Sequence, residues 1–143
     1  EFKKGNFVAQ EIKPKLLIKI EEIKKISETK SKTILDARSF ERFSGQGKEP
    51  RPGLQSGHIP NSLNLPATNL ITTKGFLYKN NYFKNILNEI KIDKNEELIA
   101  TCGSGVSACV IALAFYCSGN ENVSIYDGSW TEWASTGNKI NKF

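Results

Sequence analysis

The stretch "LIATCGSGVSACVIALAFYCSG", from Leu98 to Gly119, decides the fold class. It begins with a short apolar run, passes through Cys-Gly-Ser-Gly, and continues as an apolar segment of helical length. A buried strand that leads through a glycine-rich turn into a helix is a typical part of a parallel α/β sheet. We therefore predict a strand at 97–101 and a helix at 107–117.

Strands and helices alternate along the rest of the chain as well. Short apolar runs predict strands, and apolar residues at helical spacing predict helices. Residues 1–14 are expected to form an entering linker that includes a short strand at Phe7–Gln10. The further predicted elements are a helix from Pro14 to about Glu28 with the stripe Leu16, Ile20, Ile23 and Ile26, a strand at 33–36, a helical turn capped by Ser39, a strand at 62–65, a helix over 83–90, a strand at 123–126 and a helix from Ser129.

Length and composition limit the class of protein. The 143 residues suit one domain, and the absence of methionine predicts that this domain is part of a longer protein. The net charge of +5 comes without a basic patch that carries interleaved aromatic residues, so no nucleic-acid partner is expected. No apolar run is long enough to span a bilayer and no signal peptide is visible, so no membrane partner is expected.

The three cysteines bear on the redox compartment and on chemistry. They form no Cys-x-x-Cys pair, which argues against a disulfide framework and against zinc, and favours a reducing compartment, cytoplasmic or mitochondrial. Cys109 and Cys117 fall inside the apolar helical segment, where a free cysteine is expected to be a small core residue.

Cys102 has a different setting, because it directly follows a strand. In open α/β sheets, ligands bind outside the carboxyl ends of the strands. Gly103 and Gly105 allow the backbone to turn its N–H groups inward, and the following helix adds the partial positive charge of its N-terminus. Both effects favour the thiolate, the nucleophilic form of cysteine. The loop contains no Lys or Arg, so backbone dipoles are expected to supply most of the activation; a core cysteine beside a turn is the alternative.

Four motifs in the same order resemble the rhodanese superfamily, in particular the C-terminal catalytic domain of its 3-mercaptopyruvate sulfurtransferase branch. "CGSGVSA" (102–108) resembles the active-site loop of that family. The other motifs are "LDARSFERFSG" (35–45), "EPRPGLQSGHIPNSLNLP" (49–66) and "IYDGSWTEWA" (125–134). The resemblance implies a single α/β rhodanese-like domain over 1–143 with three layers, in which a parallel sheet of about five strands has helices on both faces. It also implies that an N-terminal rhodanese-like domain precedes this one in the parent protein.

The resemblance further implies a double displacement. The Cys102 thiolate would take the sulfur of 3-mercaptopyruvate, leaving pyruvate and a Cys102 persulfide. A thiol acceptor such as thioredoxin or glutathione, or cyanide, would then remove the outer sulfur. The family uses no metal and no organic cofactor for this reaction.

Roles for the other site residues also come from the resemblance. Arg42 and Arg51 match the arginines that grip the carboxylate and carbonyl of the donor, a task suited to a guanidinium group. Ser104 matches a serine proposed to assist proton transfer; a small polar loop residue is an equally good interpretation. The expected substrate-binding residues are Arg42, Arg51, Gly103, Gly105, Val106 and Ser107, and the expected catalytic residues are Cys102 and Ser104.

Several other polar and aromatic residues are expected to be structural. Arg38 follows Asp36 at a strand end, which favours an ion pair. His58, the single histidine, is expected to tie its loop to the sheet rather than to act as a base. Asn61 suits a position of positive φ. Trp130 and Trp133 are expected to be packing residues.

Three competing functions need to be distinguished. A related phosphatase would carry an arginine six residues after its cysteine, but position 108 is alanine. A thiosulfate sulfurtransferase would carry Lys or Arg just after the cysteine, whereas Gly103 and Ser104 are neutral, which favours mercaptopyruvate. A non-catalytic rhodanese-like binding module would often lack the cysteine, and Cys102 is present.

Overall fold

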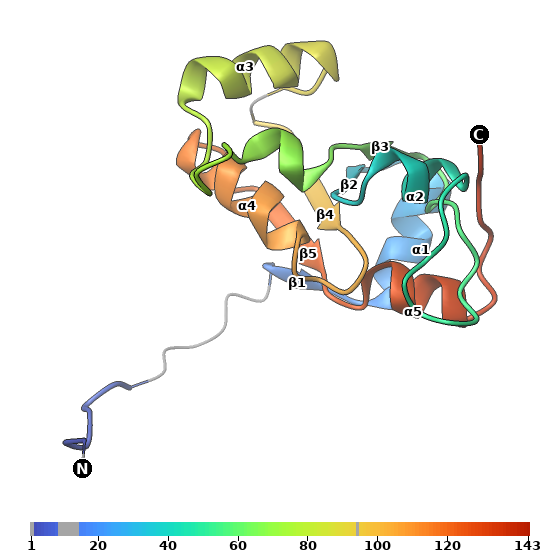
Figure 1. Ribbon diagram of the computed structural model, residues 1–143, viewed down its shortest axis with the longest axis horizontal. Coiled ribbons are helices and arrows are strands. Elements are labelled where there is room, and N and C mark those ends of the chain that lie inside the picture. Colours follow the sequence, from blue (N-terminus) through green and yellow to red (C-terminus); the bar gives the residue numbers. More distant parts are fainter. Residues whose placement is uncertain (1, 9–14, 94) are drawn as a thin grey trace.

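Five parallel strands form one sheet in this protein, in the order β1-β5-β4-β2-β3 (Figure 1). The computed structural model describes residues 2–8, 15–93 and 95–143. The strands are β1 (Leu17–Ile18), β2 (Thr33–Asp36), β3 (Ser62–Asn64), β4 (Leu98–Thr101) and β5 (Val123–Tyr126). The helices are α1 (Ile20–Thr29), α2 (Phe40–Ser44), α3 (Asn80–Glu89), α4 (Ala108–Cys117) and α5 (Ser129–Ser135), with a 3₁₀ helix η1 at Ala67–Leu70.

Helices cover both faces of the sheet, as the resemblance implies (Figure 1). Alternate residues of the central strands β2 and β4 point into two separate apolar clusters. One cluster joins the sheet to α3, α4 and η1, and the other joins it to α1 and α5. The predicted three-layer fold is therefore confirmed, with a core on each side of the sheet.

The strand order reverses between β2 and β4. From β2 the chain proceeds to β3 at one edge, and from β4 it proceeds to β5 on the other side. In open α/β sheets the ligand crevice lies at such a reversal, outside the carboxyl ends of the strands. This arrangement places the residues after Asp36 and after Thr101 beside each other, since these two residues are partners in the β2–β4 register.

The predicted helix from Pro14 is wrong at its start. Leu17 and Ile18 form strand β1, which pairs with Ile125 and Tyr126 of β5, and the helix begins only at Ile20. Pairing with a neighbouring strand, which local spacing does not reveal, overrides the helical pattern here. Pro14 itself lies outside the described residues.

Helix α4 is less buried than its composition suggests. Ile111 and Phe115 are fully buried, but Leu113 and Tyr116 on the same helix are exposed. Cys109 and Cys117 are exposed too, so the prediction that they are core residues is wrong. A helix that packs on a sheet through one side keeps its other side outward whatever residues stand there.

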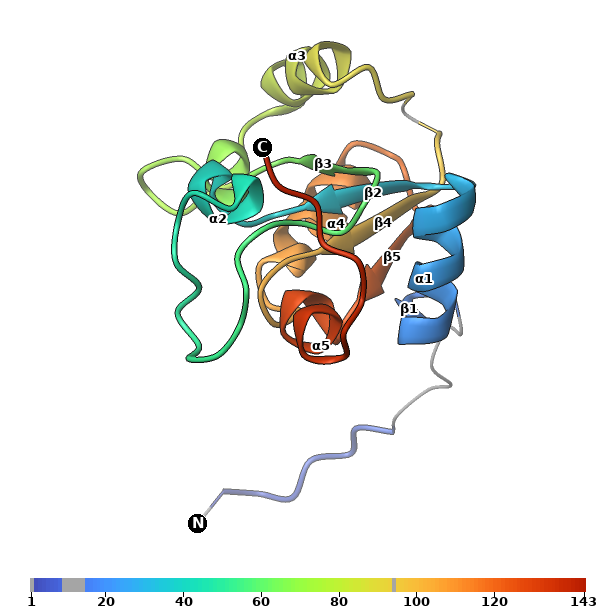
Figure 2. The same ribbon diagram turned by 90° about the vertical axis from the view of Figure 1, so that its right-hand side faces the viewer.

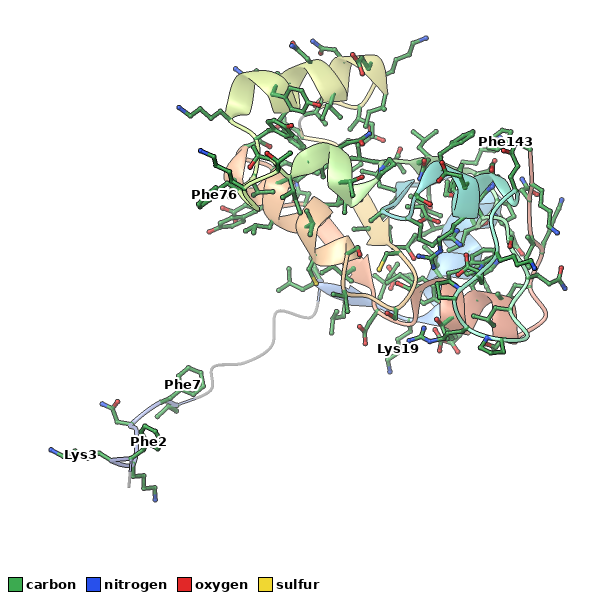
Figure 3. All side chains as sticks on the ribbon, viewed as in Figure 1. Phe2, Lys3, Phe7, Lys19, Phe76 and Phe143 are labelled. Atoms are coloured by element: carbon green, nitrogen blue, oxygen red, sulfur yellow. The ribbon has the colours of Figure 1, made fainter. Side chains whose placement is uncertain are left out.

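The N-terminal residues lie apart from the folded body. Figure 3 shows Phe2 and Phe7 well away from the sheet and its helices, and both side chains are almost fully exposed. The strand predicted at 7–10 falls partly outside the described residues, and Phe7 and Val8 have no regular structure. In the described part of the chain, no helix has both the length and the apolar character needed to cross a membrane.

The C-terminal residues pack against the loop that follows α2. His58 and Asn141 exchange backbone hydrogen bonds of 2.9 and 3.0 Å, and the amide of Phe143 donates to the carbonyl of Ser44 at 2.9 Å. The ring of Phe143 stacks on His58, which in turn stacks on Phe43 at a centroid distance of 4.0 Å. The chain end thus closes over the loop 44–58.

Candidate active site

A pocket of about 400 Å³ opens at the carboxyl ends of β2 and β4, where the strand order reverses. Six predicted site residues line it: Arg42, Arg51, Cys102, Gly103, Ser104 and Ser107. They come from α2, from the loop before β3 and from the loop between β4 and α4. The fold thus brings together residues that lie far apart in the sequence.

Cys102 lies at the base of this pocket. Its residue surface is only 2 % exposed, and its side chain belongs to the apolar cluster that joins the sheet to α4. Strand β4 ends at Thr101, so Cys102 is the first residue beyond the sheet. The thiol therefore faces a small polar opening from an otherwise apolar surrounding.

The loop after Cys102 presents several backbone N–H groups without a protein acceptor. Among the described residues, the amides of Gly103, Ser104, Val106 and Ser107 donate to no backbone or side-chain group. Helix α4 follows directly, with ten residues whose aligned dipoles add positive potential at its N-terminus. An anion or a thiolate in the pocket would therefore find free donors along this loop.

Ser129 holds the loop in this shape, a role that the sequence analysis missed. Its Oγ accepts hydrogen bonds from the amides of Cys102 at 3.1 Å and Gly105 at 3.0 Å, and donates to the carbonyl of Tyr126 at 2.8 Å. Ser129 is fully buried and has a φ of 51°, which is rare for a residue other than glycine. The residues around Ser129 predict only a helix start. They do not indicate that its hydroxyl group binds the amides of Cys102 and Gly105 instead of its own helix.

Gly105 and Val106 differ from the other predicted loop residues, because they do not line the pocket. The amide of Gly105 is taken by Ser129, and its φ of 82° makes the turn that leads into α4. The Val106 side chain is exposed at 75 %, on the outer side of the loop. Their contribution lies in the path of the backbone, which Gly105 permits at its positive φ.

Arg38 forms the predicted ion pair with Asp36. Its Nη2 lies 2.6 Å from Oδ2 of Asp36, and both side chains are 1 % exposed. The guanidinium also donates to the carbonyl of Gly57 and lies 4.3 Å from the centre of a Trp130 ring. These contacts fix one wall of the pocket.

Glu49 links Arg38 to Arg42, and the sequence analysis did not single it out. Its Oε1 accepts from Nη1 of Arg38 at 3.0 Å, while Oε1 and Oε2 accept from Nε and Nη2 of Arg42 at 3.2 and 2.7 Å. The Glu49 side chain is only 3 % exposed. A carboxylate between Lys48 and Arg51, the two basic residues of this part of the loop, was the available signal.

Arg42 reaches from α2 to the cysteine loop. A side-chain carbon at Gly103 would lie only 2.9 Å from its Nη2, so glycine at this position leaves room for the guanidinium group. The loop itself lacks basic residues, but α2 brings a guanidinium against it, in addition to the backbone dipoles that are expected to supply most of the activation.

Arg51 is exposed and held by one side chain. Its Nη1 donates to Oγ1 of Thr131, which donates in turn to the carbonyl of Gly103 at 2.6 Å. The amide of Thr131 donates to the same carbonyl at 3.1 Å. Helix α5 therefore connects Arg51 with the loop that carries Cys102, a link that sequence reasoning missed.

The remaining structural predictions can be located as well. His58 Nδ1 lies 2.8 Å from the carbonyl of Phe43, so His58 ties its loop to α2 rather than to the sheet. Burial lowers the pKa of His58 below its ordinary value, because desolvation disfavours the charged ring. Asn61 has the expected positive φ of 64°, and Trp130 and Trp133 are buried packing residues.

The family comparison agrees with this geometry. A family model described as "Rhodanese-like domain" matches residues 19–136, which cover strands β2 to β5, the pocket and all eight predicted site residues. The 3-mercaptopyruvate sulfurtransferase of Homo sapiens is 40% identical over 129 residues, which are 90% of this chain and 43% of that protein.

Two further relatives are similar over the same region. The thiosulfate sulfurtransferase of Rattus norvegicus is 41% identical over 119 residues, covering 82% of this chain and 40% of that protein. The crystal structure of SseA from Escherichia coli, described as showing the "Rhodanese" fold of 3-mercaptopyruvate sulfotransferases, matches with a TM-score of 0.75 and 33% identity, over 91% of this chain and 47% of that one. This chain spans less than half the length of each of these three.

Proposed function

Since the chain belongs to the rhodanese-like domain family, we propose that it is the catalytic domain of a sulfurtransferase that uses 3-mercaptopyruvate as donor and Cys102 as nucleophile. The observation that carries the proposal is the pocket that Cys102 lines together with Arg42, Arg51 and three residues whose backbone amides are free within the described structure, Gly103, Ser104 and Ser107. A cysteine with only a structural role would not need this surrounding.

The first half-reaction transfers sulfur to the protein. The Cys102 thiolate attacks the sulfur of 3-mercaptopyruvate, and an S–S bond forms while the S–C bond of the donor breaks. The electron pair of that bond leaves with carbon as the enolate of pyruvate, which takes up a proton to give pyruvate. The Cys102 persulfide remains. The free amides of Gly103 and Ser104 are suited to hold negative charge on sulfur during this step.

The donor carboxylate is proposed to bind between Arg42 and Arg51. Both guanidinium groups line the pocket with Cys102, and a carboxylate can accept two hydrogen bonds from one guanidinium group. Thiosulfate is the alternative donor, since the similar relatives include one named after each compound. The neutral Gly103 and Ser104 beside the cysteine, without a Lys or Arg to pair a second negative charge, support mercaptopyruvate.

Ser104 is proposed to assist proton transfer to or from the donor. It is exposed and lines the pocket next to Cys102. Among the described residues its hydroxyl has no hydrogen-bond partner, so nothing in this domain fixes its proton. Because the relatives are more than twice as long as the matched region, we propose that a second rhodanese-like domain completes the site around Ser104.

The second half-reaction passes the outer sulfur to an acceptor. A thiolate such as that of glutathione or thioredoxin, or cyanide, attacks the outer sulfur of the persulfide, and the S–S bond breaks to return the Cys102 thiolate. The pocket is open to solvent above Cys102, which supports access by such an acceptor. The three free cysteines agree with a reducing compartment, cytoplasmic or mitochondrial.

Mass spectrometry of the protein after reaction with 3-mercaptopyruvate tests this function. We expect one added sulfur atom on the peptide that contains Cys102, its loss on addition of cyanide, and no added sulfur in Cys102→Ser. Cys109→Ser and Cys117→Ser serve as controls, because both residues are exposed thiols outside the pocket. Sulfur on either of these cysteines, with Cys102 unmodified, would contradict the proposal.

A further inference from the structure

The arginines of the pocket are paired with more carboxylate than an anion-binding site needs. Three arginines line it, and two carboxylates, those of Asp36 and Glu49, are paired with them. Asp36 pairs with Nε and Nη2 of the buried Arg38 through both carboxylate oxygens, and Glu49 takes Nη1 of the same guanidinium. With Cys102 as a neutral thiol, these three arginines and two carboxylates therefore have a net charge of +1. Without Glu49 their net charge would be +2.

Glu49 also determines which edge of Arg42 is free. It occupies Nε and Nη2, which form one edge of the guanidinium plane. The other edge, formed by Nη1 and the second N–H of Nη2, has no partner among the described residues. Since Nη2 lies against Gly103, this free edge borders the cysteine loop and can take the two oxygens of one carboxylate.

We infer that Glu49 is a positioning residue that makes the pocket selective for a monocarboxylate over a dianion. It does so by orienting the free edge of Arg42 and by cancelling one positive charge beside the bound anion. This inference rests on the proposed function in one respect, namely that the sulfur donor, 3-mercaptopyruvate, is a monocarboxylate. The binding of anions to the pocket can be measured without any sulfur transfer.

A purely structural role for Glu49 is the competing explanation. Arg42 is 27 % exposed and could be solvated by water, and Arg38 has its own bidentate partner in Asp36. Arg42 therefore does not require Glu49 to satisfy its donors, but Nη1 of the buried Arg38 has Glu49 as its one partner among the described residues. Loss of stability alone would therefore not distinguish the two roles, whereas a change in the ratio of anion affinities does. Because the Glu49 side chain is 3 % exposed and lines the pocket, its charge is weakly screened and acts on any anion bound there.

Protection of Cys102 from alkylation measures this selectivity. Neutral iodoacetamide is the reagent, pyruvate is the monocarboxylate and sulfate is the dianion. The modification rate is followed on the Cys102 peptide by mass spectrometry, so that the exposed Cys109 and Cys117 do not interfere. Each anion yields a dissociation constant from its protection, and the ratio of the two constants is the quantity compared between variants.

Glu49→Gln removes the charge at nearly constant size. We expect sulfate to bind more tightly and pyruvate less tightly, so that the ratio of the pyruvate constant to the sulfate constant rises on the order of tenfold. Glu49→Asp keeps the charge but is too short to reach both arginines, so pyruvate binding should weaken several-fold with little change for sulfate. Glu41→Gln, an exposed carboxylate on the same helix as Arg42, is the matched charge control and should leave the ratio unchanged.

The inference would be overturned if Glu49→Gln weakened the binding of pyruvate and sulfate equally, or left the ratio of their dissociation constants unchanged. It would also be overturned if neither anion protected Cys102 of the wild type from alkylation. Urea denaturation of each variant shows whether the fold is intact. If Glu49→Gln does not fold, Glu49→Asp provides the test: its binding of pyruvate should weaken while its binding of sulfate should change little, and any other result would contradict the inference. Failure of the proposed function would look different: the protection pattern would hold while no persulfide forms.

Discussion

The amide of Cys102 donates a hydrogen bond to Oγ of Ser129, a residue 27 positions later in the chain, at a distance of 3.1 Å. The carbonyl of Cys102 accepts from the amide of Trp130 at 2.9 Å, so both polar groups of the Cys102 backbone are bound to the start of α5. Cys102, the proposed nucleophile, is therefore positioned by a helix that packs on the opposite face of the sheet from α4.

Ser129→Ala should destabilise the protein and reduce sulfur transfer. The change leaves the buried amides of Cys102 and Gly105 without their acceptor, which should cost about 2 kcal/mol in the free energy of unfolding. Urea denaturation measures this loss. Ser135→Ala, on the exposed side of the same helix, is the control and should change stability by less than about 0.5 kcal/mol. Equal effects in the two variants would contradict the role assigned to Ser129.

Gly105→Ala should be much more damaging than Gly53→Ala. Both glycines have a φ near 80°, so the backbone cost of a side chain, roughly 1–2 kcal/mol, is the same at each. A Cβ at Gly105 would lie 2.5 Å from Oδ1 and 3.0 Å from the carbonyl oxygen of Asp127, whereas a Cβ at Gly53 meets nothing within 4 Å. The difference between the two unfolding free energies isolates this contact, and we expect Gly105→Ala to lose most of its activity as well. A Gly105→Ala protein as stable as Gly53→Ala would show that the loop can move aside.

Arg51→Ala should impair the reaction with 3-mercaptopyruvate more than that with thiosulfate. Loss of a charge-assisted contact to the carboxylate should lower kcat/KM about ten- to a hundredfold, equivalent to roughly 1.5–3 kcal/mol. Thiosulfate has no carboxylate and should lose less. Lys48→Ala removes an exposed positive charge from the same loop and is the control for long-range electrostatics. Equal losses for the two donors would exclude Arg51 as the carboxylate ligand.

The stability of the protein should fall as the pH is lowered through the range in which histidine titrates. Burial lowers the pKa of His58 below its ordinary value of 6.5, against weaker opposing effects of the Phe43 carbonyl and the Asp36 charge. Below pH 6.5 the unfolded chain therefore binds a proton that the folded chain does not, and protons stabilise the unfolded state. Stability rises with pH across this window and is lost as the pH falls through it.

The variant His58→Asn tests this dependence, because His58 is the only histidine in the chain. Urea unfolding of the wild type should give a smaller free energy at about pH 5.5 than at about pH 7.5, and the variant should show a clearly smaller change between the two. The quantity compared is the change in unfolding free energy between the two pH values. A loss of stability in the variant that is the same at both pH values therefore does not affect the comparison. The same slope in both proteins would assign the titration to other groups.

Much of the sheet was predictable because its strands are short, apolar and separated by turn residues. β2 and β5 coincide with the predicted ranges, and β3 and β4 differ from theirs by one residue. β1 was not predictable: two residues in an amphipathic stretch become a strand only because β5 offers an edge for pairing. The exposed side of α4 escaped prediction for a similar reason, since an all-apolar helix does not indicate which side will face the sheet.

The site was predictable where its residues form local motifs. Cys102 and its glycines lie in one turn, and Arg42 and Arg51 are recognised through the family resemblance. Ser129 and Thr131 were missed because each acts through a partner far along the chain, as in the contact of Thr131 with the Gly103 carbonyl across 28 residues. Glu49 was missed because it lies in a loop without regular spacing, from which its pairing with Arg38 and Arg42 does not follow. Such contacts depend on how α5 and the loop before β3 meet, which Figure 2 shows on one side of the domain.

The packing of the last residues matters for how the protein is handled in the laboratory. Phe143 is bonded to Ser44, and the loop that begins there carries Glu49 and Arg51 into the pocket. An affinity tag or a sensor-surface attachment placed next to Phe143 would strain the backbone bridge between Asn141 and His58. Tags and immobilisation chemistry are better placed at residues 2–8, which lie away from the folded body in Figure 3.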